Sequence, residues 1–273
     1  MQNAHSFERY LTVSKGLQPI TVHGYVGAAD RFTRVVGENP DHELVETYVF
    51  ELYTSNYSYS HKLNTALAIE QYMSFLGKPI KLGRQKKPRP MVKDTLTEAE
   101  VTRLLFSTKN VREHAILCIL AYSGIRNQEL CSLRVRDFRV TENVIRIFKG
   151  KGLKDGLSEV TPECSRAVID YLAAFPRSED QYLFTTLRRG EPLRTQDIRK
   201  LTKVVARRAR MTKRVYPHLF RHSMTANMIL RGADIVSLKN QLRHTLLETT
   251  LHYANSIVFT ERNRYQKFAP SYI

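Results

Sequence analysis

A basic, proline-containing segment at residues 78–94 divides this 273-residue chain into two regions with different patterns. The segment holds three prolines and seven lysines or arginines against a single acidic residue. Because proline lacks a backbone N–H and restricts the residue before it to extended conformations, no regular helix or strand can run through this segment. We interpret residues 81–94 as a linker between a domain at 1–80 and another at 95–273. It is either a strap for a polyanion or a solvated tether.

The region before the linker is predicted to contain four helices. Its apolar residues recur at three- and four-residue spacing, and glycine and proline lie between the runs. The predicted helices cover 6–13, 19 to about 37, 41–53, and a final stretch that carries Leu63, Leu67, Ile69, Tyr72, Phe75 and Leu76. No internal repeat of fixed period interrupts this pattern.

The region after the linker is predicted to be mostly helical with a small antiparallel sheet. Thr97 and Glu100 have the spacing of a capping box at a helix start. Alternating residues at 143–149 and a possible return at 157–160 predict a strand pair joined by a glycine-rich turn. The predicted helices cover 111–123, which Gly124 ends, and then 127–133, 162–175, 194–211, 217–231, 234–242 and 246–254.

The formal charge of +17 is unevenly distributed. Residues 1–90 carry a net +3 and residues 91–273 a net +14. Such an excess favours a polyanionic partner, because each neutralised phosphate releases condensed counterions, although a basic protein that is merely soluble remains the alternative. Residues 188–214 alone carry a net charge of +9. Their helical spacing places cations around much of a helix, so we predict that one face of this helix contacts DNA and that its other faces are solvated.

Two further features limit the class of protein. The N-terminus has no apolar signal-like region, and no apolar stretch approaches the roughly 20 residues of a membrane span, so we expect a cytoplasmic, nucleoid-associated protein. The three cysteines, Cys118, Cys131 and Cys164, are odd in number and lack CxxC spacing. We expect reduced thiols in or near the core rather than disulfides or metal ligands.

Candidate catalytic groups are concentrated in the C-terminal region. A tyrosine phenol titrates near pH 10, so it attacks a phosphodiester at neutral pH only when neighbouring cations stabilise the developing charge. Arginine suits this task, because its planar fork donates two parallel bonds to phosphate oxygens. The candidates are Tyr253 as nucleophile, Arg126 and Arg221 as phosphate ligands, and Lys151, His218 and His244 as proton carriers or further donors.

Each of these residues has a simpler interpretation. Arg126 could form a helical ion pair with Glu129, which is compatible with catalysis, and Lys151 could be a solvated hairpin tip with Lys149 and Lys154 as rivals. The i, i+4 spacing of His218 and His222 could indicate a metal site, but no glutamate follows the first histidine as HExxH requires. We therefore predict no metal site at these histidines.

Taken together, four sequence blocks resemble those of the tyrosine recombinase (phage integrase) family. The first, 123–130, is Ser-Gly-Ile-Arg-Asn-Gln-Glu-Leu; the second, 149–152, is Lys-Gly-Lys-Gly; the third, 218–223, is His-Leu-Phe-Arg-His-Ser; the fourth runs from 242 to 253 and ends in Leu-His-Tyr. Each block is weak evidence alone. Their shared order and spacing make the resemblance specific, and it covers nearly the whole chain.

The resemblance implies site-specific DNA strand exchange through a covalent 3′-phosphotyrosyl intermediate, without ATP or a required metal. In that case Tyr253 is the nucleophile, Arg126 and Arg221 hold the phosphate, Lys151 is the general acid, and His218 and His244 assist. It also implies a mainly α, C-shaped clamp: a helical core-binding domain and a catalytic domain with a small antiparallel sheet. A type IB topoisomerase-like enzyme and a non-catalytic DNA-binding factor are the alternatives.

The resemblance further implies a homotetramer on two DNA duplexes with short inverted-repeat core sites, from a protein that is monomeric when free. Residues 257–273 match a C-terminal tail that joins neighbours or folds back on its own domain, and we expect no additional arm-site domain at the N-terminus. The expected non-catalytic DNA contacts are Arg84, Lys86, Lys87, Arg89, Arg199, Lys203, Arg207 and Arg243. Arg243 departs from the family, which usually has glycine there, so it either adds a cation near the phosphate or points outward.

Overall fold

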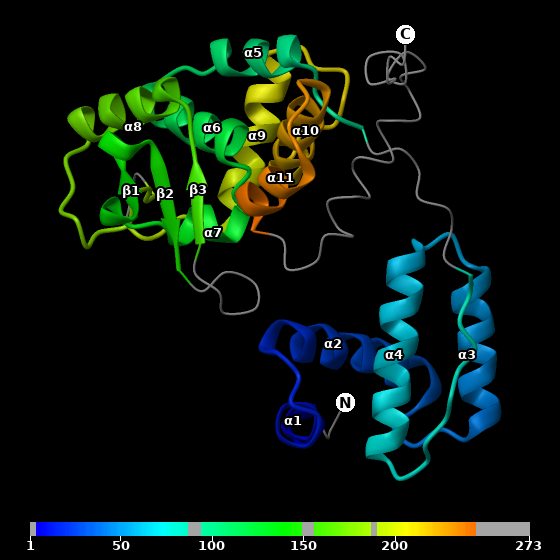
Figure 1. Cartoon of the computed structure of the whole chain (residues 1–273). Helices are drawn as coiled ribbons and strands as arrows, with labels where there is room; N and C mark the ends of the chain where they lie inside the picture. The colour runs from blue at the N-terminus through cyan, green and yellow to red at the C-terminus, as the bar shows by residue number, and fades with distance from the viewer. Residues whose placement is uncertain (1–3, 87–93, 149–155, 187–189, 244–273) are drawn as a thin grey trace, which may run out of the picture. The chain divides into compact units, whose positions relative to one another are not determined.

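The computed structural model describes residues 4–86, 94–148, 156–186 and 190–243. The chain divides into two compact units, 1–91 and 92–273, and each has its own hydrophobic core. The prediction of a mainly helical protein with a small antiparallel sheet is confirmed (Figure 1). In the part of the chain that the structure describes, no helix is both long and apolar enough to cross a membrane.

The first unit is helical throughout its described elements. They are α1 (Ala4–Arg9), a π-helical turn η1 (Tyr10–Ser14), α2 (Pro19–Val36), α3 (His42–Thr54) and α4 (Tyr59–Phe75). Pro19 begins α2, where a missing N–H costs nothing, and the Asp41 and Ser58 side chains cap α3 and α4 by accepting backbone N–H groups. The four predicted helical segments therefore form, and the first of them continues into the π-helical turn.

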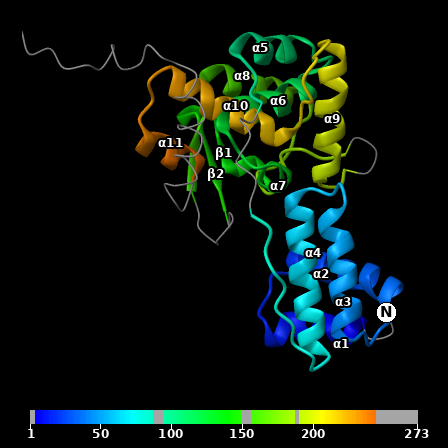
Figure 2. The same ribbon diagram turned by 90° about the vertical axis from the view of Figure 1, so that its right-hand side faces the viewer.

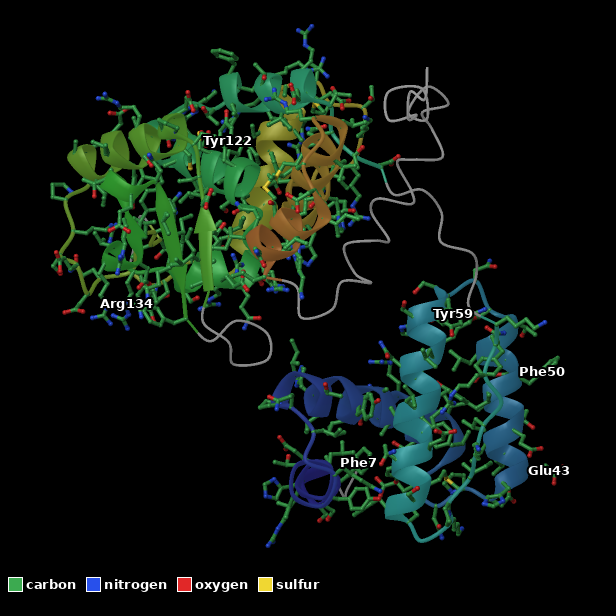
Figure 3. The ribbon with its side chains drawn as sticks, in the orientation of Figure 1. Phe7, Glu43, Phe50, Tyr59, Tyr122 and Arg134 are labelled. Carbon is green, nitrogen blue, oxygen red and sulfur yellow. The ribbon has the colours of Figure 1, made fainter. Side chains whose placement is uncertain are left out.

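Aromatic side chains fill the core of the first unit. Phe7 and Tyr72 are fully buried with their rings edge to face, 5.2 Å between centroids. The Tyr72 hydroxyl donates to the Glu38 carbonyl at 2.8 Å, so its polar end is satisfied. Figure 3 shows that the Phe7 side chain projects from α1 toward α4, whereas Phe50 projects from the outer side of α3 and is 68% exposed.

The first part of the predicted linker is attached to this unit. Residues 81–86 form neither helix nor strand, as predicted. Glu70 on α4 holds them, because its carboxylate accepts the Leu82 N–H at 2.7 Å and the Arg84 guanidinium at 2.6 Å. The Tyr53 hydroxyl donates to the Gly83 carbonyl at 2.7 Å. Residues 82–84 are thus fixed along α3 and α4 rather than free as a tether.

The second unit surrounds a buried helix with other helices and a three-stranded antiparallel sheet of order β1-β2-β3. Its elements are α5 (Glu98–Phe106), α6 (Val111–Ser123), α7 (Asn127–Ser132), η2 (Val135–Asp137), β1 (Phe138–Arg139), η3 (Val140–Glu142), β2 (Val144–Ile147), β3 (Gly156–Glu159), α8 (Pro162–Ala174), α9 (Thr195–Arg208), α10 (Pro217–Leu230) and α11 (Ile235–Leu242). Helix α6 packs between α8 and α10, and α11 lies beside β3 (Figures 1 and 2). The predicted helix at 246–254 lies outside the described residues.

The predicted cysteine environment agrees with the structure. Cys118 and Cys164 are buried, Cys131 is half-buried, and all three are free thiols. Burial raises the pKa of Cys118 to about 12 and the pKa of Cys131 to about 11. These thiols remain protonated at neutral pH and act as core side chains.

Helix α5 begins with the predicted capping box, which allows a stability test. Thr97 accepts the Glu100 N–H at 3.2 Å, and the Glu100 carboxylate accepts the Thr97 N–H at 2.8 Å. We expect Thr97→Ala to lower the free energy of unfolding of the second unit by about 1 kcal/mol, because an end-of-helix donor loses its partner. The melting temperature should fall by roughly 2–4 °C. Thr102→Ala, on the exposed side of the same helix, is the control and should leave stability equal or slightly higher.

Candidate active site

Arg126 stands at the start of α7, immediately after the turn that ends α6. Its backbone N–H donates to the Glu129 carboxylate at 2.8 Å, and its Nη1 donates to the other carboxylate oxygen at 2.8 Å. Glu129 is buried, while the Arg126 side chain is 25% exposed. The predicted helical ion pair therefore forms, and it holds a partly accessible guanidinium in one orientation.

Arg221 is the second candidate phosphate ligand, and it is buried within α10. Its Nη1 donates to the Gly124 carbonyl, and its Nη2 donates to the Leu242 carbonyl at 2.7 Å. The first acceptor lies two residues before Arg126 and the second immediately before Arg243. One planar fork thus ties together the backbone segments that carry two other arginines.

Gly124 is required at the turn between α6 and α7. Its φ of +63° is the left-handed conformation that side chains disfavour, and a Cβ there would come within 2.6 Å of Met224 Cε and 3.1 Å of Leu242 Cδ2. The turn must therefore lie close against α10 and α11, where the Gly124 carbonyl meets Arg221. A small residue at this position brings the two arginine-bearing segments together.

Gln241 attaches α11 to the sheet. Its side-chain amide accepts the Glu159 N–H at 3.0 Å and donates to the Glu159 carbonyl at 2.8 Å, as a neighbouring strand would. Ser158, also on β3, donates to the Ser123 carbonyl at 2.7 Å. The ends of α6 and α11 are thereby fixed on β3.

Arg243 adopts a left-handed conformation at the end of α11, with φ 52° and ψ 45°. A residue with a Cβ pays roughly 1–2 kcal/mol there relative to glycine. Its Nη2 donates to Glu129 Oε2 at 2.7 Å, and its side chain is only 11% exposed. The interpretation that Arg243 points outward is wrong, since its guanidinium lies on the carboxylate that also holds Arg126.

Two arginines therefore share one buried carboxylate. Burial alone would raise the pKa of Glu129, but the charge of Arg243 and the Arg126 N–H and guanidinium outweigh it and place that pKa below its ordinary value. Burial also lowers the pKa of Arg243, an effect that Glu129 opposes and Arg126 reinforces. Arginine stays charged even so, and the three groups form an ionised triad at neutral pH.

The triad makes stability depend on pH. Because the pKa of Glu129 is depressed in the folded protein, its ionisation stabilises the fold above the unfolded value near 4.5, and this contribution is lost as pH falls through the lower folded pKa. We expect Glu129→Gln to lower the free energy of unfolding at pH 7 by about 1.5–3 kcal/mol. Urea titrations from pH 7 to pH 3 should show the difference between wild type and variant shrinking below pH 4.5. A constant difference over this range would contradict the assignment.

His218 lies on the first turn of α10, three residues before Arg221, and is exposed. Its ring centroid is 6.1 Å from that of His222, which is buried one turn further along. Among the described residues, no group of three or more His, Cys, Asp or Glu side chains is arranged to hold a metal ion. His218 is thus accessible to a substrate at the N-terminal end of the helix that carries Arg221.

Several predicted site residues fall outside the described part of the chain. These are Lys151, His244, Tyr253, Lys87 and Arg89. Lys151 belongs to the segment between β2 and β3, and His244 directly follows Arg243. The described structure therefore unites Arg126, Arg221 and Arg243, and it fixes the chain positions from which the Lys151 and His244 segments depart.

The predicted basic face of α9 is present. Arg199, Lys203 and Arg207 are spaced one turn apart and exposed, whereas Ile198, Thr202 and Val205 on the opposite side are buried. Arg208 is separate from this face, because its guanidinium pairs with Glu113 at 2.6 Å. Of the predicted contacts in the linker, Lys86 is exposed, but Arg84 is held by Glu70.

Sequence reasoning identified one member of the site only in part and missed another. Glu129 was visible as a partner of Arg126 at i+3, but its second partner, Arg243, is 114 residues away in the chain. Gln241 gave no signal at all, because a glutamine that completes a strand edge has no characteristic neighbours in sequence. Both residues depend on α11 meeting α7 and β3, which only the folded structure shows.

Comparison with known proteins gives a consistent result. The model of the Phage integrase family matches residues 94–258. A tyrosine recombinase of Pseudothermotoga lettingae is 28% identical over 270 residues, covering 92% of this chain and 93% of its own. The tyrosine recombinase XerA of Pyrococcus horikoshii is 29% identical over 253 residues, covering 90% and 86%.

Solved structures agree in fold. The crystal structure of a XerA recombinase superposes with a TM-score of 0.58 at 26% identity and covers 100% of both chains. A XerH site-specific recombinase bound to palindromic difH substrate superposes with a TM-score of 0.72 at 18% identity, covering 97% of this chain and 83% of that one. At that identity the second likeness concerns the fold alone.

Proposed function

Since the chain belongs to the phage integrase family and is a site-specific tyrosine recombinase, we propose that Tyr253 cleaves DNA at a phosphate held by Arg126 and Arg221. Lys151 then protonates the leaving oxygen, and His218 and His244 accept the tyrosine proton or donate to the phosphate. The chemistry needs no cofactor.

One observation supports the proposal that the arginines hold the scissile phosphate. The Arg221 fork is buried and already bonded to the backbone beside Arg126 and Arg243, so the guanidinium groups are positioned before any substrate arrives. Donors that are fixed in advance lose no reorganisation energy when charge develops on a phosphate, and each is worth roughly 3–4 kcal/mol in the transition state. A module that only bound DNA would have no need for a buried fork of this kind, since exposed cations suffice for phosphates.

The proposed reaction is a transesterification with balanced bonds. The Tyr253 oxygen forms a bond to phosphorus as the bond from phosphorus to the 5′ oxygen breaks, the tyrosine proton passes to a base, and the 5′ oxygen receives a proton. The product is a 3′-phosphotyrosine and a free 5′ hydroxyl. Because the phosphodiester energy is kept in the phosphotyrosine, a 5′ hydroxyl of a partner strand can reverse the step without ATP.

DNA contacts outside the site follow from the charges. The exposed row Arg199, Lys203 and Arg207 on α9 is proposed to bind phosphates, which fixes register but not sequence. Residues 1–80 are proposed to be the core-binding domain, joined by a linker at 81–94 to the catalytic domain at 95–273. The protein is proposed to act in the cytoplasm, at the nucleoid.

The proposed assembly is a homotetramer that forms from monomers on two duplexes with short inverted-repeat core sites. Residues from about 257 onward are proposed to join neighbouring protomers. The XerH protein of the solved complex was bound to a palindromic substrate, which is consistent with such sites. Analytical ultracentrifugation with and without a two-site DNA would test the change from monomer to tetramer.

Covalent capture tests the function directly. A binding site is first selected from a random duplex library, and a nick is then placed near its cleavage point so that the short 5′-hydroxyl strand diffuses away. We expect a protein–DNA adduct that resists denaturation, with the modified peptide mapping to Tyr253. A bound site without any adduct would favour a non-catalytic binding factor. Ready relaxation of a supercoiled plasmid without a site, at low enzyme, would favour a topoisomerase-like enzyme.

A further inference from the structure

The conformation of Arg243 implies a specific use for its side chain. The residue occupies the left-handed region at φ 52°, where glycine would be unstrained. Strained residues persist only where the surrounding contacts determine them, and those contacts must therefore favour an arginine here. The contacts of the Arg243 guanidinium and of its aliphatic stem identify what the residue does.

The aliphatic stem of Arg243 lies against the start of β3. A Cβ at Gly156 would collide with Cδ of Arg243 and lie 3.0 Å from its Cγ, so a glycine at 156 leaves the room that the stem occupies. Gly156 immediately follows the segment that carries Lys151. Arg243 therefore packs where the strand begins and immediately precedes His244.

The guanidinium of Arg243 changes the charge available at the site. Arg126 and Glu129 alone form a formally neutral pair, in which both carboxylate oxygens accept bonds from Arg126. Arg243 adds a positive charge to Glu129 Oε2 at 2.7 Å. The triad thus carries a net +1, and Arg126 shares its counter-ion instead of being neutralised by it.

The Arg243 Nη1 gives an independent indication. It is buried, and none of the residues that the structure describes (4–86, 94–148, 156–186 and 190–243) accepts a hydrogen bond from it. A buried donor without an acceptor is unfavourable, and it favours states in which an anion approaches the cluster. The same cluster includes Arg126, whose side chain is 25% exposed and faces the same carboxylate.

We propose that Arg243 is a positioning residue that offsets the charge of Glu129, so that Arg126 keeps its positive field for the scissile phosphate. The inference rests on the proposed function, since it concerns the rate of the same cleavage step. Glycine at this position would leave the backbone relaxed and Arg126 paired with Glu129 alone. Arginine at this position strains the backbone and gives the triad a net positive charge.

A charge series tests the proposal by single-turnover cleavage of the nicked substrate. Arg243→Met keeps the stem and removes the charge, and we expect cleavage about 10-fold slower with DNA affinity within twofold of wild type. Arg243→Lys keeps the charge and should recover at least half of the loss on a logarithmic scale. Arg231→Met, which removes an arginine from the exposed pair with Glu98 in the same unit, is the matched control and should cleave like wild type.

A double-mutant cycle separates charge from shape. If Arg243 acts by offsetting Glu129, then Arg243→Met should slow cleavage less than threefold when Glu129 is already Gln. Melting curves of all variants identify any that fail to fold, and Arg243→Lys then carries the comparison. The proposal is overturned if Arg243→Met cleaves at the wild-type rate, if Arg243→Lys is as slow as Arg243→Met, or if the loss persists in the Glu129→Gln background. Failure of the wild type to form any adduct would instead overturn the proposed function.

Discussion

Replacing Tyr253 by phenylalanine is expected to abolish the covalent adduct and recombination while leaving DNA binding unchanged. Phenylalanine keeps the ring and removes only the oxygen that attacks phosphorus, so no phosphotyrosine can form at this position. Loss of the nucleophile in a comparable covalent mechanism costs about 10⁶-fold in rate. The measurement is denaturing gel analysis of the nicked substrate, with affinity measured on the intact site.

The controls for this result are a second tyrosine and a binding assay. Tyr57→Phe removes the hydroxyl of a tyrosine that is 59% exposed in the first unit, and it should form adduct at the wild-type rate. Equal affinity of wild type and Tyr253→Phe for the intact site shows that the loss concerns chemistry. An adduct that persists in Tyr253→Phe would show that another residue is the nucleophile and would contradict the proposed mechanism.

Local signals predicted the helices of the second unit because those signals are complete within a few residues. The helix at 111–123 forms with those bounds, since the Asn110 side chain caps its start and Gly124 ends it in the left-handed conformation. The capping box at Thr97 forms for the same reason. Strand β1 was missed because it is two residues long, and only pairing with β2 makes it a strand.

The site was predictable in residue type but not in geometry. The spacing of Arg126 and Glu129 predicts their pair, since residues three apart on a helix are neighbours. Sequence could not show that Arg221 is buried or that its fork binds two backbone carbonyls, because those acceptors belong to the ends of two other helices. Arg243 was recognised as unusual, yet its orientation depends on Glu129, 114 residues away in the chain.

Arg221→Lys should lower cleavage by about 10²–10³-fold, because lysine keeps the charge and loses the planar fork. In the wild type, Nη1 and Nη2 reach the Gly124 and Leu242 carbonyls together. A single ammonium cannot replace both bonds in the same geometry and still present N–H groups to a phosphate. The free energy of unfolding should also fall by about 1–3 kcal/mol, since one buried carbonyl is left without its donor. Single-turnover cleavage and urea unfolding measure the two effects.

Arg208→Lys is the matched control for this substitution. Arg208 also uses both terminal nitrogens, at 2.6 Å and 3.3 Å from the Glu113 carboxylate, but it lies in α9 and pairs outside the arginine site. Its replacement should leave cleavage within twofold of wild type. If Arg221→Lys also cleaved within threefold of wild type, the buried fork would be a structural tie alone, and the phosphate would have to be held by Arg126 with other groups. A large loss in Arg221→Lys beside none in Arg208→Lys would show that the rate depends on this fork, because both changes conserve charge and remove the same planar group.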